Sequence, residues 1–173
     1  MKLLQDFELY RSIIEDGFLQ AKKSVLISTA NLKNIRIPTG RRSSKSLVEV
    51  LLDLAGRDVF VHLLHASPPS FSFRKEADRR KLSANPNIVL FQCPRVHFKS
   101  VIVDERWMYL GSANLTGAGL GAKSERKRNF EMGFITQDAA LIRAVGARFD
   151  EITEKRLCPP CFFYSQCWGP KKK

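Results

Sequence analysis

Residues 96–114 of the chain, VHFKSVIVDERWMYLGSAN, decide its fold around two adjoining strands. The first nine residues are rich in β-branched side chains and alternate in polarity, which is typical of a strand. Side chains two positions apart on a strand point to the same face. The stretch therefore predicts that His97 and Lys99 lie together.

The second half of this stretch predicts another strand, over residues 106–110, after a short Asp-Glu turn. It ends in Gly-Ser-Ala-Asn, where the same spacing places Ser112 and Asn114 on one face. If the two strands pair, an imidazole, an ammonium, a hydroxyl and an amide meet at one place. These groups suit a phosphodiester, because the imidazole can attack phosphorus while the others hold its non-bridging oxygens without a metal ion.

The spacing of these residues, with Asp104 between the two pairs, resembles the HKD signature of the phospholipase D superfamily. The Gly-rich residues 115–121 and the Asn-Phe-Glu at 129–131 are similar to the segments on the C-terminal side of that signature in the family. The resemblance covers roughly residues 9–152 and implies one half of a phospholipase D fold.

The resemblance also implies roles for single residues. It makes His97 the nucleophile and assigns the phosphoryl oxygens to Lys99, Ser112 and Asn114. It implies that Glu131 orients the His97 imidazole through a hydrogen bond, whereas Asp104 serves the fold more than the chemistry.

The chain carries one His-x-Lys motif, whereas the larger members of the superfamily carry two. The reaction requires one imidazole as nucleophile and a second as acid. A single-motif chain supplies both only by pairing across a two-fold axis, as the small bacterial endonucleases of the superfamily do. We therefore expect a homodimer in which one His97 forms a phosphohistidine. The partner's imidazole then protonates the leaving oxygen and activates water.

Hydrophobic periodicity predicts helices over residues 4–20, 44–55, 73–82 and 139–154, and further strands over residues 24–28, 58–64, 88–92 and 130–136. Residues 31–43 are expected to form a basic loop, with Ser43 or Ser44 capping the next helix. This order predicts an α/β fold, a mixed sheet with helices on both faces. His62 and His65 fall on a predicted strand or at its end and are expected to be structural.

With 173 residues the chain is long enough for one domain with a sizeable core. We expect a catalytic domain over residues 1–156 and a cysteine-containing tail over residues 157–173, packed on the domain. No apolar run approaches the length of a membrane span. The acidic residues within residues 1–18 favour an amphipathic helix over a secretory signal, so the sequence predicts a cytoplasmic protein.

The net charge of +12 favours a polyanionic partner. Nucleic acid is the first choice, with DNA ahead of RNA, and an anionic membrane is the second. The alternative is a basic surface that is merely solvated. The residues expected to bind substrate are Lys123, Arg126, Lys127 and Arg128 beside the motif, and Arg41 and Arg42 in the basic loop.

Three cysteines in the tail, Cys158, Cys161 and Cys167, have the spacing C-x2-C-x5-C, and Cys93 lies far upstream. Because disulfides are disfavoured in the cytoplasm, a metal site is the first interpretation. The spacing resembles that of the iron-staple nucleases, which implies a structural [4Fe–4S] cluster. A four-cysteine zinc site and free thiols are the alternatives. No cofactor is expected for catalysis.

These observations favour a metal-independent phosphodiesterase, an endonuclease acting on nucleic acid. One alternative is a basic nucleic-acid-binding subunit of a larger defence or repair complex, with a dormant site. The other is a phospholipid phosphodiesterase, for which an apolar rim beside the site is expected in place of the Lys and Arg seen here.

Overall fold

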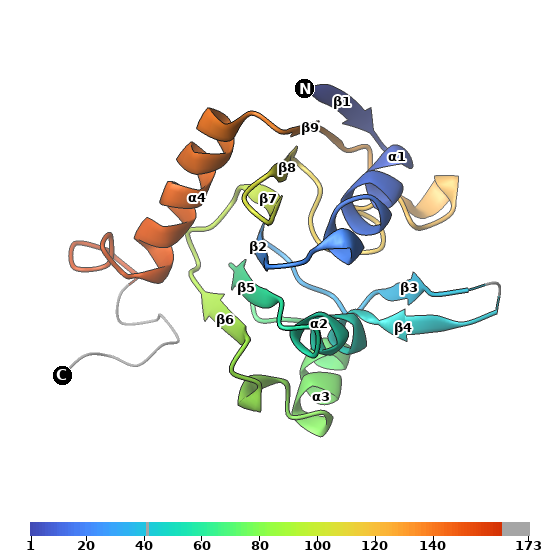
Figure 1. The fold of residues 1–173 in the computed structure, drawn as a ribbon, viewed down its shortest axis with the longest axis horizontal. Coiled ribbons are helices and arrows are strands. Elements are labelled where there is room, and N and C mark those ends of the chain that lie inside the picture. The colour runs from blue at the N-terminus through green and yellow to red at the C-terminus, as the bar shows by residue number, and fades with distance from the viewer. Residues whose placement is uncertain (41, 164–173) are drawn as a thin grey trace.

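In residues 1–40 and 42–163, which the computed structural model describes, seven strands form one mixed sheet (Figure 1). In order across the sheet they are β1 (Lys2–Gln5), β9 (Met132–Thr136), β8 (Trp107–Gly111), β7 (Lys99–Val103), β2 (Ser24–Thr29), β5 (Phe60–His65) and β6 (Ile88–Gln92). β2, β5 and β6 run parallel, and the other four are joined by antiparallel pairing. The predicted mixed sheet is confirmed.

Helices cover both faces of the sheet, as expected (Figure 1). One face packs against α1 (Glu8–Tyr10) and its continuation Arg11–Glu15, the turn Phe18–Gln20, α2 (Leu47–Ala55) and α3 (Phe71–Arg79). α4 (Ala139–Thr153) covers part of the other face. The two-residue period of a strand explains this division, because Val25 and Ile27 of β2 enter the first core and Leu26 packs toward α4.

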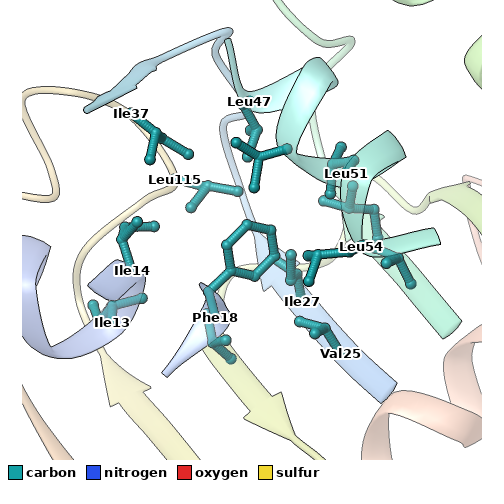
Figure 2. Packing of buried hydrophobic residues seen from close by; sticks show 14 of the residues in the cluster. Ile13, Ile14, Phe18, Val25, Ile27, Ile37, Leu47, Leu51, Leu54 and Leu115 are labelled. Carbon is teal, nitrogen blue, oxygen red and sulfur yellow. The ribbon is translucent and has the colours of Figure 1, made fainter. Parts of the chain in front are cut away.

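The larger core lies between the sheet and α2 (Figure 2). Phe18, Leu51 and Leu54 are buried against Val25 and Ile27 of the central strand. Burial of side chains of this kind contributes about 1.5–3 kcal/mol each relative to exposure. This apolar layer holds β2 in place, and the other strands of the sheet extend on either side of it, from β7 and from β5.

The predicted helix over residues 4–20 is wrong at its start. Lys2–Gln5 forms the edge strand β1, which pairs antiparallel with β9, and Leu4 is fully buried. Asp6 then adopts a positive φ of 46°, which no α-helix can accommodate. The partner strand lies near the other end of the sequence, so local periodicity could not reveal this pairing.

Two further expectations need correction in the segment before α2. The predicted basic loop contains a two-stranded hairpin, β3 (Arg36–Pro38) and β4 (Ser44–Ser46), which projects from the body of the molecule (Figure 1). The cap of α2 is Ser46, neither Ser43 nor Ser44. Ser46 Oγ accepts from Glu49 N, and the Glu49 carboxylate accepts from Ser46 N, which is a capping box.

None of the helices in the described part of the chain combines the length and the apolar character that a bilayer crossing requires.

Candidate active site

The ends of four neighbouring strands bring most of the predicted site residues to one edge of the sheet. β7 pairs with β8 so that Lys99 faces Gly111, and with β2 so that Ser100 faces Ser28. The carboxyl ends of β2 and β8 therefore lie beside the amino ends of β7 and β9. We call this the motif edge; it carries His97, Lys99, Ser112, Asn114 and Glu131.

Lys99 is the buried cation of the motif edge. Its residue is only 7% exposed, and its ammonium donates a hydrogen bond of 2.7 Å to the carbonyl oxygen of His97. Among the described residues it forms no ion pair with a carboxylate. A buried charge with one neutral partner is costly, so this ammonium has capacity to bind an anion.

His97 is exposed and lies two residues before β7, so the strand begins later than predicted. Its imidazole makes no hydrogen bond to any described residue. The link between His97 and Lys99 is therefore the bond from the ammonium to the His97 backbone. The ring is accessible to a substrate, as a nucleophile requires.

Glu131 and Ser112 are coupled to each other. The Ser112 hydroxyl donates a short hydrogen bond to the Glu131 carboxylate, which also accepts from Asn129 Nδ2 at 2.9 Å. The hydrogen bond predicted from the His97 imidazole to the Glu131 carboxylate is absent among the described residues, where this carboxylate accepts from Ser112 and Asn129. Whether Glu131 orients His97 during the reaction stays a prediction.

Asn114 is held by the end of β2. Its Oδ1 accepts from Asn31 N at 3.0 Å, and Thr29 Oγ1 accepts from Leu115 N at 3.0 Å. Nδ2 of Asn114 has no hydrogen-bond partner in the described part of the chain, so it is a donor available to a ligand. Thr29 and Asn31 were not predicted, because they lie more than 80 residues from Asn114 in the sequence and no local signal points to them.

Tyr109 supports the turn that carries Ser112 and Asn114. Its hydroxyl oxygen accepts from Ala113 N at 3.2 Å, and burial raises the pKa of Tyr109 to about 12. A Cβ on Gly111 would lie 2.6 Å from both Met132 O and Gly133 Cα. The glycine of Gly-Ser-x-Asn is therefore required for the close approach of β8 to β9.

The structure does not bring Asp104 to the motif edge, because Asp104 comes after the opposite end of β7. Its carboxylate accepts from the backbone N–H groups of Lys22, Lys23 and Ser24 at 3.0, 2.7 and 2.9 Å. Burial by itself raises the pKa of Asp104, but these three donors outweigh it and hold the pKa below its ordinary value. These hydrogen bonds fasten the β7–β8 turn to the start of β2.

The basic segment 123–128, which precedes Glu131, lies beside α1 (Figure 1). Lys123, Arg126 and Lys127 are exposed, while the Arg128 guanidinium lies 5.7 Å from the centre of the Phe7 ring. The other two expected binding residues are Arg41 and Arg42. Arg42 is exposed between β3 and β4, and Arg41 lies outside the described residues.

Three of the four predicted metal ligands line a common pocket. Cys93, Cys158 and Cys161 lie in its wall although Cys93 is far from the others in sequence. Cys167 lies outside the described residues. The other two histidines have structural contacts, as expected: His62 stacks on Phe149, and His65 Nδ1 bonds to Ser67 O at 3.0 Å.

A mixed sheet with His, Lys, Ser and Asn gathered at one edge defines a class of α/β phosphodiesterase domains. Residues 16–153 match the family model described as cardiolipin synthase, PLD-like domain. The chain belongs to the phospholipase D superfamily, whose members are phosphodiesterases that include nucleases and phospholipid synthases. A comparison with curated protein sequences finds no match.

Solved structures share this fold. NucT from Helicobacter pylori is 17% identical, with a TM-score of 0.62 over 88% of this chain and 94% of that one. Nuc from Salmonella typhimurium, a phospholipase D family member, is 16% identical, with a TM-score of 0.61 over 88% and 93%. The archaeal chromatin protein TrmBL2, which binds DNA, is 12% identical, with a TM-score of 0.57 over 90% of this chain and 53% of that one.

Proposed function

We propose that the protein is a metal-independent phosphodiesterase that cleaves nucleic acid as a two-fold homodimer. The observation that carries the proposal is the buried ammonium of Lys99, which is unpaired with any described carboxylate and is bonded to the backbone of the exposed His97. An anion bound there would satisfy the ammonium and would bring phosphorus next to a nucleophile.

In this mechanism the His97 imidazole of one subunit attacks phosphorus and forms an N–P bond while the bond to the leaving oxygen breaks. The imidazolium of the second subunit gives its proton to that oxygen. The neutral imidazole that remains on the second subunit then accepts a proton from water. This water attacks phosphorus and releases His97. Lys99 and the free Nδ2 of Asn114 hold the non-bridging oxygens as charge shifts onto them.

Exposed apolar side chains beside the motif edge support the homodimer. Phe130 and Met132 are 97% and 53% exposed and line a pocket together with Ser112 and Glu131. Leu3, 57% exposed, lies on the edge strand β1, which pairs with β9. Exposed apolar side chains grouped in this way are typical of an interaction surface. A second copy seated there would cover them and supply the second imidazole that one chain lacks.

The charge distribution favours nucleic acid over phospholipid. The net charge is +12, and the exposed cations Lys123, Arg126 and Lys127 precede Glu131 in the loop beside the motif edge. The DNA binding of TrmBL2, a protein of similar fold, agrees with this choice. Phosphates along a strand would extend from the site onto the loop.

The test is cleavage in EDTA of single-stranded DNA, double-stranded DNA, RNA and phosphatidylglycerol vesicles in parallel. Wild-type protein is expected to cleave a nucleic acid, and His97→Ala to lose at least about a thousandfold in rate. Cleavage that occurs only with added magnesium contradicts the mechanism. Cleavage of the vesicles alone assigns the protein to the phospholipid phosphodiesterases.

The homodimer is tested by mixing wild-type protein with an excess of His97→Ala. If each subunit supplies one imidazole, mixed dimers have a single His97, and activity falls well below the wild-type fraction of the mixture. Activity that depends on the wild-type concentration alone contradicts a shared site.

One observation favours a second candidate, a nucleic-acid-binding subunit with a dormant site. Glu131 is engaged by Ser112 and Asn129, and no described residue orients His97. In that case wild-type protein and His97→Ala bind DNA with equal affinity, and neither cleaves it.

A further inference from the structure

A cavity between the edge strand β6 and α3 has no role in the chemistry of the motif edge. Its volume is about 600 Å³, within the range of about 300–1,000 Å³ that is typical of ligand pockets. Much of its wall is apolar, and this part is formed by Pro68, Pro69, Phe73, Leu82 and Leu90. A flat ligand with apolar faces and a polar edge fits a wall of this kind.

The polar part of the wall offers mainly hydrogen-bond acceptors. His65 Nδ1 bonds to Ser67 O at 3.0 Å, so Nδ1 carries the proton and Nε2 is an acceptor. Gln92 Nε2 donates to Ala66 O at 3.3 Å, which leaves Oε1 as a second acceptor. Neither acceptor has a hydrogen-bond partner in the described part of the chain, and the carboxylate of Asp78 also lines the cavity. Acceptors suit the N–H groups on the edge of a nucleobase, whereas Asp78 would repel a phosphate inside the cavity.

The segment that borders this cavity, residues 66–70, is fastened to the motif edge. Ser70 N donates to Leu32 O at 3.0 Å, and the adjacent Asn31 N donates to Asn114 Oδ1 at 3.0 Å. β5 and β6 run parallel to β2, so their carboxyl ends lie at the same edge of the sheet. β6 is three strands away from β7, which corresponds to about 14 Å at the usual strand spacing. A few nucleotides span this distance, so a strand held at the motif edge can reach the cavity.

Two cations of α3 are available to such a strand. Arg74 lines the cavity and Lys75 follows it, and both are exposed. Neither side chain forms an ion pair or a hydrogen bond with a described residue. At the other end of the helix, by contrast, Arg79 and Arg80 are both paired with Glu76. The unpaired charges of α3 therefore lie where the phosphates of a strand entering the cavity would pass.

Phe71 adds an exposed aromatic ring at the same place. It is the first residue of α3 and is 72% exposed. Arg74 is three residues further along the helix, so the two side chains are neighbours on its surface. An aromatic ring beside unpaired cations is typical of proteins that stack the bases of a single strand.

We propose that the cavity between β6 and α3 binds a nucleobase of a single-stranded segment, while Phe71 stacks on a neighbouring base and Arg74 and Lys75 bind phosphates. The choice of nucleic acid as the ligand rests on the proposed function. In a duplex the bases are paired with each other, and turning one out of the stack is costly. Single strands should therefore bind more tightly than duplexes of the same length.

Fluorescence anisotropy tests the cavity with the full chain carrying His97→Ala, which lacks the proposed nucleophile. The probes, in EDTA, are a labelled DNA single strand, an abasic strand of the same length and a hairpin duplex. Ser83→Trp and Phe71→Ala should each weaken single-strand binding about tenfold and abasic-strand binding less than about twofold. Ser83 is exposed in the cavity wall, so a Trp there fills the cavity without altering the core. Phe60→Ala is the matched control, because Phe60 is exposed at the opposite end of β5.

Four results would overturn the proposal or one part of it. Unchanged single-strand affinity in Ser83→Trp overturns the cavity as a base site, and unchanged affinity in Phe71→Ala overturns the stacking. An equal loss with the abasic strand overturns both parts, because the contacts would then be to the backbone. A Ser83→Trp variant that alters only the sedimentation of the protein assigns the cavity to a contact between copies of the chain.

Photocrosslinking locates the bound base directly. A single strand containing 5-iodouracil, irradiated in complex with the same protein, should become linked to peptides from residues 65–92. Links confined to other segments overturn the site. These experiments measure binding alone, so base-dependent binding without any cleavage supports this inference and contradicts the proposed enzyme. Cleavage in EDTA with base-independent binding does the reverse.

Discussion

A charged residue of the motif lies at each end of β7, and the two residues differ in how fully their charges are hydrogen-bonded. At one end the Asp104 carboxylate accepts three backbone hydrogen bonds from residues 22–24. At the other end Lys99 is more deeply buried, yet its one hydrogen-bond acceptor among the described residues is a neutral carbonyl oxygen. A charged group whose hydrogen bonds are all made within the protein stabilises the fold. A buried charged group that lacks such partners is available to bind a ligand. Mutations at the two ends should therefore separate stability from activity.

The largest effect is expected from Lys99→Met, which removes the ammonium and keeps the length of the side chain. Turnover of a chromogenic phosphodiester should fall about a hundredfold to a thousandfold, because a donor to the developing charge is removed. Stability should stay the same or rise, since a buried charge with no described ion-pair partner is removed. Urea denaturation measures the second quantity. A clear loss of stability would show that Lys99 serves the fold.

The opposite result is expected from Asp104→Asn. The free energy of unfolding should fall by about 1–3 kcal/mol, because charge-assisted hydrogen bonds are weakened at a site that ties β7 to β2. The kcat of the folded protein should be unchanged. Glu105→Gln is the matched control, because the neighbouring Glu105 is exposed. If Asp104→Asn lowers kcat at full stability, Asp104 belongs to the chemistry after all.

The same carboxylate predicts a pH dependence of stability. The pKa of Asp104 in the folded protein lies below its ordinary value of 3.8, which approximates the unfolded chain. Its stabilisation is therefore complete above pH 3.8 and is lost as the pH falls through the lower folded value. The stability difference between wild type and Asp104→Asn should be constant near neutrality and should shrink below about pH 4. A difference independent of pH would exclude the carboxylate charge as its cause.

The smallest effect is expected in the basic segment 123–128. Replacing Arg126, Lys127 and Arg128 with Ala should weaken DNA binding and reduce the slope of log K against log salt by about 0.9 for each phosphate that is no longer neutralised. The kcat at saturating substrate should change little. A charge-matched control triple is provided by Arg57 in the turn after α2, Arg79 of α3 and Arg143 of α4. An equal slope in both triples would mean that the loop is merely solvated.

The sequence predicts the residues of the motif edge because their spacing has the period of a strand. His97, Lys99, Ser112 and Asn114 can be recognised from local pattern, and antiparallel pairing of β7 with β8 brings the last three together. The capping box of α2 could also have been found, since Ser46 and Glu49 have its three-residue spacing.

Other features depend on contacts between distant segments, which no local pattern encodes. The pairing of β1 with β9 and the bond from Asn31 N to Asn114 are of this kind. Asn129, which donates to the Glu131 carboxylate, is close to it in sequence. Which of several nearby donors makes this hydrogen bond nevertheless depends on the folded structure. The approach of Cys93 to the tail likewise required a three-dimensional structure.

The pairing of β1 with β9 has a consequence for the order of events during synthesis. Glu131 N donates to Asp6 Oδ1, and Asp6 N donates to Glu131 O, so one wall of the motif edge joins an early segment to a late one. Such long-range closure is slow and comes late in folding. A nascent chain on the ribosome therefore cannot complete this wall until residues 132–136 have emerged from the exit tunnel. The motif edge therefore stays incomplete until this late segment of the chain has been synthesised.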